Sequence, residues 1–253
     1  MRIDELKMNT PARFFTLALL MAISMSLSAC NKNAEDTPEP TPQISEEEAA
    51  AVVEGAVTAR TQGLGAELED AIYLADEYAE KSGNGGPCGE PFDSTLTRSI
   101  DTANLTASYT VNWSWLVNCN TLNIPTAIDY QRAATGSYET ARMSSSDSAN
   151  SNWSISSLIQ GPNYVLDGTY TRQGSQQSRV RNQNSFSSTL LIEVDNLNID
   201  KGTRRIQSGI AGFTLTITGP GNNTQTIEGD IVFNGNGSAT IIINGNSYNV
   251  NLY

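Results

Sequence analysis

Histidine is absent from the 253 residues of the chain, and this absence removes a large part of enzyme chemistry. Hydrolases with a histidine base, histidine-ligated zinc centres and histidine acid–base catalysis are all impossible within such a chain. No glycine-rich loop of the kind that holds a phosphate group is present either. Carboxylate chemistry is what remains, and we expect neither a cofactor nor a bound metal.

Basic residues are also scarce. The chain has 15 lysine and arginine residues against 27 aspartate and glutamate residues, a net charge of −12. Binding to nucleic acids depends on lysine and arginine side chains that neutralise phosphates, so this balance argues against a nucleic-acid partner. The acidic excess lies in residues 31–80, which hold 13 acidic residues and only two basic ones, Lys32 and Arg60.

A hydrophobic run lies near the amino terminus. Residues 14–29, FFTLALLMAISMSLSA, carry no charge and follow Arg13. The run is too short to span about 30 Å of hydrocarbon comfortably, but it has the length of a signal-peptide core. Two acids in the preceding MRIDELK do not suit a positive leader, so we expect translation to start at Met8 rather than Met1. We expect residues 1–29 to be a signal peptide outside the fold.

The run ends in LSAC, residues 27–30, which resembles the lipobox of bacterial lipoproteins. The resemblance implies that the signal is cut before Cys30, that its sulfur carries a diacylglyceryl group and that the new amino terminus takes a further acyl chain. Such an anchor is lasting because two or three acyl chains hold a protein where one holds it only marginally. An ordinary signal peptide with an incidental cysteine is the alternative. Residues 30–43, which contain three prolines, are expected to form an extended tether.

Residues 44–82 have the pattern of an acidic amphipathic helical segment. Ser45 and Glu48 stand at capping-box spacing, and Ile44 is placed to pack on the first turn. A helix is therefore expected from there to about Thr61, and a second one after QGLG. The second has one apolar stripe that needs a sheet to pack on, and the stripe consists of Leu64, Leu68, Ala71, Ile72, Ala75, Tyr78 and Ala79. The acids on its back predict a solvated face, and they are Glu67, Glu69, Asp70, Asp76, Glu77 and Glu80.

Residues 83–253 have the period-two pattern of β-strands. In residues 105–119, LTASYTVNWSWLVNC, every second residue from Leu105 suits a buried face and the others are mostly polar. Turn sequences rich in glycine and asparagine separate similar, weaker patterns. Further strands are expected at 126–143, 152–160, 163–173, 185–199, 204–218, 225–234, 238–244 and 247–253. The expected fold class is mainly β with an N-terminal helical segment, an antiparallel meander that forms a curved sheet, half-barrel or barrel.

Cysteine is rare, with three residues in the chain. With Cys30 taken as the anchor, Cys88 and Cys119 remain as an even pair outside the cytoplasm, where disulfides persist. We expect a bridge between them, which would close a loop of about 30 residues and stabilise the fold by roughly 3 to 4 kcal/mol. Two buried free thiols are the alternative. The chain has no CxxC pair that would suggest a redox role.

Two carboxylate pairs are candidates for chemistry. Glu193 with Asp195, and Glu228 with Asp230, are i, i+2 pairs that a strand sets on one face about 7 Å apart. A glycosidase or a calcium site could use this spacing. Apolar residues alternate with these acids, however, so we expect all four to point away from the core and to solubilise the surface. No catalytic residue is predicted.

Aromatic and amide side chains are the other candidates. Trp113 and Trp115 share a strand face and could stack on a sugar, but their apolar neighbours favour a place in the core, as for Trp153. The many asparagine, serine, threonine and glutamine residues of the wet face fit a secreted surface and could hydrogen-bond glycans.

Three triplets, DST at 93–95, DTA at 101–103 and DSA at 147–149, resemble the acceptor signal of periplasmic O-glycosylation. The acceptors implied by this resemblance are Ser94, Thr102 and Ser148. Ordinary turn-favouring triplets are the alternative.

The layout of an acidic helical segment behind a lipobox, one cysteine pair and a polar meander resembles uncharacterised envelope lipoproteins of Gram-negative bacteria. This likeness implies a lipid-anchored protein of the cell envelope, at the outer membrane, on its periplasmic or surface face, and implies no activity. Two functions are therefore expected. One is non-catalytic binding of a lipid or glycan in or on the curved sheet, and the other is docking of another envelope protein. A carboxylate-dependent glycosidase is a third hypothesis.

Overall fold

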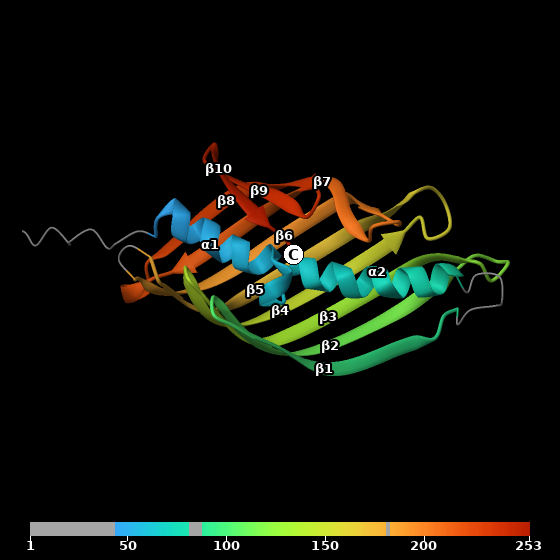
Figure 1. The fold of residues 1–253 in the computed structure, drawn as a ribbon, viewed down its shortest axis with the longest axis horizontal. Coiled ribbons are helices and arrows are strands. Elements are labelled where there is room, and N and C mark those ends of the chain that lie inside the picture. The colour runs from blue at the N-terminus through green and yellow to red at the C-terminus, as the bar shows by residue number, and fades with distance from the viewer. Residues whose placement is uncertain (1–43, 81–87, 181–182) are drawn as a thin grey trace, which may run out of the picture. The chain divides into compact units, whose positions relative to one another are not determined.

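The computed structural model describes residues 44–80, 88–180 and 183–253 (Figure 1). The signal peptide, Cys30 and the tether expected from the sequence lie outside these residues. The helical part consists of α1 (Glu46–Val57), the short 3-10 helix η1 (Ala59–Thr61) and α2 (Leu64–Glu80). The strands are β1 (Pro91–Thr102), β2 (Leu105–Cys119), β3 (Pro125–Thr140), β4 (Met143–Ser156), β5 (Asn163–Ser178), β6 (Ser185–Asp200), β7 (Arg205–Thr218), β8 (Thr224–Gly235), β9 (Ser238–Ile243) and β10 (Asn246–Asn251), with a 3-10 turn, η3 (Pro220–Asn222), between β7 and β8.

The strands form a single antiparallel sheet in the order of the sequence, from β1 to β10. Every strand pairs with its neighbour in the chain, as short turns require. In the described residues β1 and β10 are the two edges and do not pair with each other. The predicted mainly β meander is confirmed, and of the shapes expected for it the structure is an open curved sheet.

Both helices lie across the same face of the sheet (Figure 1). We call this the inner face and the opposite one the outer face. Helix α1 packs near β9 and α2 near β3, and nine of the twelve residues of α1 are buried. The predicted stripe on α2 is buried from Leu64 to Tyr78, while Ala79 is half-buried. The helices thus supply the apolar surface that the inner face of the sheet needs.

The capping box predicted at the start of α1 is present. The backbone N–H of Glu48 donates to Ser45 Oγ at 3.3 Å, and the N–H of Ser45 donates to the Glu48 carboxylate at 3.0 Å. The break between the helices is equally local in origin. Gln62 adopts a left-handed conformation with φ of 56°, and a Cβ at Gly63 would overlap the carbonyl of Ala56. Glycine at this point lets the chain turn from α1 into α2.

Cys88 and Cys119 form the predicted disulfide, with their Cα atoms 5.7 Å apart. It ties the segment that leads into β1 to the end of β2. Trp153 is buried, as expected of a core residue. Trp113 and Trp115 pack against the core but are only half-buried, because they lie on β2 next to the edge strand β1.

Three parts of the sequence prediction were wrong, two of them in the strands and one in α2. The edge strand β1 was not predicted, and the region before residue 152 was not assigned to β4, which starts at Met143. Glu67 was placed on the solvated back of α2, yet only 1% of its surface is exposed. Among the described residues, no helix is long and apolar enough to cross a membrane.

Candidate functional site

Two buried arginines of the sheet hold the break between the helices. Arg172 on β5 donates to the carbonyl oxygens of Gly55, at 2.6 Å, and of Thr61, at 3.1 Å. Arg132 on β3 donates to the carbonyl oxygen of Gln62 at 3.2 Å. Carbonyls at the end of a helix have no partner within the helix, and a cation there is favoured by the helix dipole. The arginines therefore fix α1, η1 and α2 on the inner face.

Arg172 is neutralised by a carboxylate from the neighbouring strand. Its Nε lies 2.9 Å from the Asp147 carboxylate, and its Nη2 also donates to the hydroxyl of Tyr109 at 2.5 Å. Ser145 donates a further hydrogen bond to Asp147 at 2.6 Å. Every member of this cluster is buried. A buried charge pair needs such additional hydrogen bonds to offset desolvation, so the cluster is a structural anchor.

Arg132 has a weaker counterion, Glu67 of α2, at 3.5 Å. The carboxylate of Glu67 also accepts hydrogen bonds from Trp153 Nε1, at 2.5 Å, and from Ser151. Burial raises the pKa of Glu67 to about 7, against the opposing pull of Arg132. The inner face is thus covered by the helices, and the buried charged groups beneath them are paired with one another, although Arg132 Nε and the hydroxyls of Tyr130 and Tyr170 have no hydrogen-bond partner within the described residues. We therefore turn to the outer face of the sheet as the place to look for a ligand.

The outer face carries two registered rows of hydroxyl and amide side chains, each eight strands wide. The first row runs from β1 to β8 and consists of Ser99, Ser108, Ser137, Ser146, Ser175, Ser187, Thr218 and Thr224. The second row runs parallel to the first and lies two residues away from it on each strand. It consists of Thr97, Thr110, Thr135, Ser148, Gln173, Thr189, Thr216 and Thr226.

All sixteen side chains of the two rows are exposed or half-buried, and none is charged. Charged residues make up about 25 to 35% of a surface designed for solubility alone. Within the described residues the rows make one side-chain hydrogen bond, a 3.5 Å contact between Thr218 and Thr224. Their donors and acceptors therefore face solvent, spaced about 4.8 Å apart from strand to strand.

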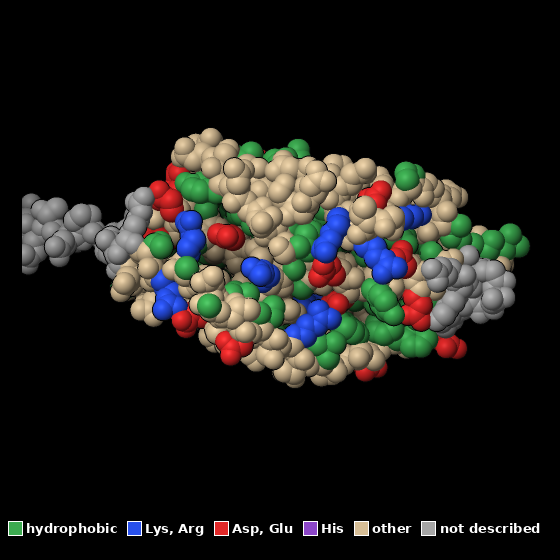
Figure 2. Space-filling model, viewed as in Figure 1, with side chains coloured by type: hydrophobic (Ala, Val, Ile, Leu, Met, Phe, Trp, Pro, Cys, Tyr) green, Lys and Arg blue, Asp and Glu red, His purple; other side chains and the backbone are tan. Residues whose placement is uncertain are grey.

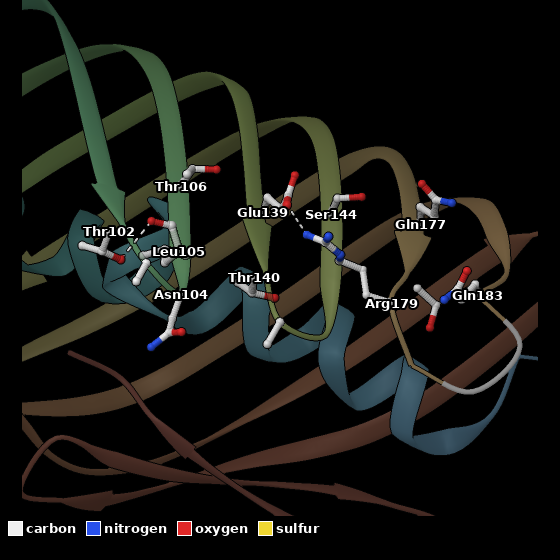
Figure 3. A pocket seen from close by; sticks show the side chains of 13 residues that line it. Thr102, Asn104, Leu105, Thr106, Glu139, Thr140, Ser144, Gln177, Arg179 and Gln183 are labelled. Atoms are coloured by element: carbon white, nitrogen blue, oxygen red, sulfur yellow. Dashed lines mark hydrogen bonds and ion pairs between the residues drawn. The ribbon is translucent and has the colours of Figure 1, made fainter.

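Three cavities follow these rows and the adjoining strand ends. The first, of about 710 Å³, lies at the turns between β1 and β2, β3 and β4, and β5 and β6 (Figure 3). The second, of about 690 Å³, shares Thr106, Ser144 and Gln177 with the first. The third, of about 530 Å³, shares Ser146 and Ser175 with the second. We call the continuous hollow that they form the outer groove.

The exposed charged residues of the outer groove lie at its end near the turns. Figure 3 shows Thr106, Glu139, Ser144 and Gln177 following one another from strand to strand, and Arg179 reaching back to Glu139. Glu139 and Arg179 form an ion pair, so they leave no net charge there. In the middle of the groove the exposed lining side chains are mostly neutral hydroxyl and amide groups, which can both donate and accept hydrogen bonds, and Asp147 there is buried and paired with Arg172.

The helix side of the molecule differs from the outer groove in the charge of its side chains. Figure 2 shows side chains of both charges next to each other across the middle of that side. The ion pairs there include Asp70 with Arg98, at 2.6 Å, and Glu69 with Arg205, at 2.5 Å. Charges of both signs thus lie side by side near the helices, whereas neither of the two rows contains a charged side chain.

The carboxylate pairs predicted from the sequence point away from the core, as expected. Glu193, Asp195, Glu228 and Asp230 are all exposed. They do not form a metal site, since no three side chains of the described residues that could ligate a metal come together. Glu193 and Asp230 lie in one row of the outer face with Gly212 between them.

The three triplets that resemble glycosylation signals lie in different surroundings. Ser94 is half-buried on β1, and Thr102 is exposed at the turn into β2, where it lines the outer groove. Ser148 is half-buried within the second row, but the Asp147 of its triplet is buried and paired with Arg172. A glycosylating enzyme could reach Thr102 in the folded protein. Recognition of Asp147 would instead require strand β4 to unfold.

Sequence reasoning found the polar wet face but not the rows or the groove. Serine and threonine were visible along each strand, yet the register between strands decides which of them stand side by side. No family model, curated protein or solved structure matches the chain.

Proposed function

We propose that this protein is a non-catalytic envelope lipoprotein that binds a neutral glycan in the outer groove. The observation that supports this most is the pair of uncharged hydroxyl and amide rows, which make almost no hydrogen bonds with the protein itself. Sugar hydroxyls donate and accept hydrogen bonds as serine and threonine do, so the two surfaces are chemically matched.

The spacing of the rows favours an extended chain. Neighbouring strands place successive side chains about 4.8 Å apart, which is close to the advance of one sugar residue in an extended glycan. A chain lying across the strands would therefore meet an equivalent hydrogen-bonding group at each residue. Lipid is the weaker choice, because α1 and α2 fill the inner face that would have enclosed an acyl chain.

The test uses two pairs of side chains on the same two strands. Ser146 and Ser175 are paired across β4 and β5 within the groove, while Asn152 and Thr169 are paired outside it. In a calorimetric titration with neutral polysaccharides, Ser146→Ala with Ser175→Ala should weaken binding about tenfold or more. The matched control, Asn152→Ala with Thr169→Ala, should bind as the unaltered protein does. Equal affinities for both variants would remove the groove from the proposal.

Membrane anchoring through Cys30 is part of the proposed function. Its support is the lipobox-like sequence at residues 27–30. Cys30→Ser should give a soluble or uncleaved protein when cells are fractionated, since no acyl chains can be attached. A variant that is still cleaved and recovered with the membrane would contradict the anchor.

Docking of another envelope protein is a second candidate function, favoured by the edge strand β1. This strand has no partner on its outer side in the described residues, and Phe92, Leu96 and Ile100 on its inner side are only half-buried. An extended segment of a partner could add to this edge through main-chain hydrogen bonds. Thr95→Pro, which places a ring at the same edge outside the two rows, should abolish crosslinking to such a partner and leave glycan binding intact.

A further inference from the structure

A fourth cavity, of about 540 Å³, lies on the helix side of the same turns. It is lined by α1, η1, the turn between β1 and β2, the start of the turn after β3, and the end of the chain near Tyr253. Its size is that of a small-ligand site, for which volumes of about 300 to 1,000 Å³ are typical. We call it the rim cavity.

The rim cavity continues the outer groove around the ends of the strands. Both are lined by the segment from Thr102 to Leu105 and by Thr140 and Ala141. The two turns that carry these residues separate the outer groove from the rim cavity and belong to both. A chain that lies in the groove can therefore place its last residue in the rim cavity.

The charges of the rim cavity are unlike those elsewhere in the molecule. Of the eight arginines in the described residues, six form ion pairs with carboxylates. The two that do not are Arg60 and Arg142, and both line the rim cavity. In a protein with 27 acidic residues, two exposed arginines that form no ion pair within the described residues thus line one cavity.

One carboxylate faces these arginines. Glu54 of α1 lines the rim cavity and makes no side-chain hydrogen bond or ion pair within the part of the chain that the structure describes. Partial burial raises its pKa, and the field of Arg142 opposes this shift. Glu54 is also free to accept hydrogen bonds from hydroxyl groups of a ligand.

We propose that the rim cavity binds an acidic sugar, one that carries a carboxylate, at the end of the glycan chain held in the outer groove. This inference rests on the proposed function and deepens it. Arg60 and Arg142 bind the carboxylate, since the planar guanidinium group matches its geometry. Glu54 accepts hydrogen bonds from the hydroxyl groups of that sugar, and the side chains of Leu105 and Tyr138 contact its apolar face.

The test compares two oligosaccharides that differ in one group. The first is a neutral hexasaccharide extended by a terminal uronic acid, and the second is its methyl ester, in which the carboxylate carries no charge. The full mature protein in detergent should bind the acid about tenfold more tightly than the ester. Arg60→Gln with Arg142→Gln should reduce the affinity for the acid to that for the ester, and should leave binding of the ester unchanged.

The control variant is Arg204→Gln, which removes an exposed arginine that is already paired with Asp76. It should keep the full preference for the acid. Equal binding of acid and ester by the unaltered protein would overturn the acidic-sugar site while leaving the neutral-glycan function standing. Binding of neither compound would instead overturn the proposed function itself. A preference that survives the double arginine substitution would show that the rim cavity is not where the carboxylate binds.

Discussion

Serine side chains occur on both faces of strand β4, but they have different roles on the two faces. On the inner face Ser145, Asp147 and Ser151 are buried, and each has a hydrogen-bond partner. On the outer face Ser146 and Ser148 face solvent and make no side-chain hydrogen bond with the described protein. Alternation along the strand alone separates the two sets. A serine in this sheet therefore holds the fold or is free for a ligand according to its position, and its identity does not decide which.

The largest expected effect on stability comes from the buried arginine–carboxylate clusters of the inner face. Arg172→Met should leave Asp147 as a buried charge without its arginine partner, and should remove the hydrogen bonds that Arg172 donates to the carbonyls of Gly55 and Thr61. Breaking a buried pair in this way costs about 3 to 5 kcal/mol of unfolding free energy, to be measured by urea denaturation. Arg179→Met, which removes the exposed pair with Glu139, should cost less than about 1 kcal/mol. Similar losses in both variants would mean that the inner and outer charges do not differ in role.

The disulfide should have the next largest effect, because it constrains the unfolded chain. Replacing both Cys88 and Cys119 with serine reopens a loop with a sequence separation of 31 residues. The expected loss is about 3 to 4 kcal/mol in the chain-entropy model. Reduction of the unaltered protein should reproduce this loss, and the double variant should then be insensitive to reductant. If it still responds to reductant, the effect of the reductant does not come from the Cys88–Cys119 bridge.

Glu67 makes the stability of the inner face depend on pH. Its pKa rises from 4.5 to about 7 on folding, so the folded state binds a proton that the unfolded chain releases between these values. The stabilising contribution is fully present below pH 4.5 and is lost as the pH rises through 7, by at most about 3 kcal/mol. Glu67→Gln should flatten the fall in unfolding free energy over this window. Glu69→Gln, on the exposed side of α2, should leave it unchanged.

The smallest effect is expected on the outer face. Ser146→Ala and Ser175→Ala should each change the unfolding free energy by less than about 0.5 kcal/mol, because exposed hydroxyls have water in both states. Ser151→Ala on the inner face removes a donor to the buried Glu67 and should cost about 1 to 3 kcal/mol. Thermal unfolding of the three variants side by side measures this contrast. A groove serine as costly as Ser151 would show that the rows are part of the fold rather than a free surface.

Strand β4, of which only the second part was predicted, is the strand with the largest share of buried polar residues. Strand β4 has Ser145, Asp147 and Ser151 at inner positions, so the alternation of apolar and polar residues is lost until Trp153. The edge strand β1 was missed for a related reason. Its inner positions include Ser94 and Arg98, which an edge tolerates because these positions are only half-buried.

Glu67 was misassigned because its partners lie far away in the sequence. Along α2 it occurs among acids that are exposed or half-buried, such as Glu69 and Asp70. Only the tertiary structure brings Arg132 and Trp153 within reach of its carboxylate. Arg132 and Arg172 were not singled out from the sequence, since the helix carbonyls among their partners are groups that any sequence would supply.

The sequence by itself determined the features that depend on neighbours along the chain. The capping box at Ser45, the break at Gly63, the long strand from Leu105 to Cys119 and the outward direction of Glu193 all follow from local spacing and local chemistry. The tertiary structure alone decided what depends on register and curvature. Which serines form a row, which arginines are left without a carboxylate and where the groove meets the rim cavity are set by contacts between distant strands, and period-two alternation carries no information about them.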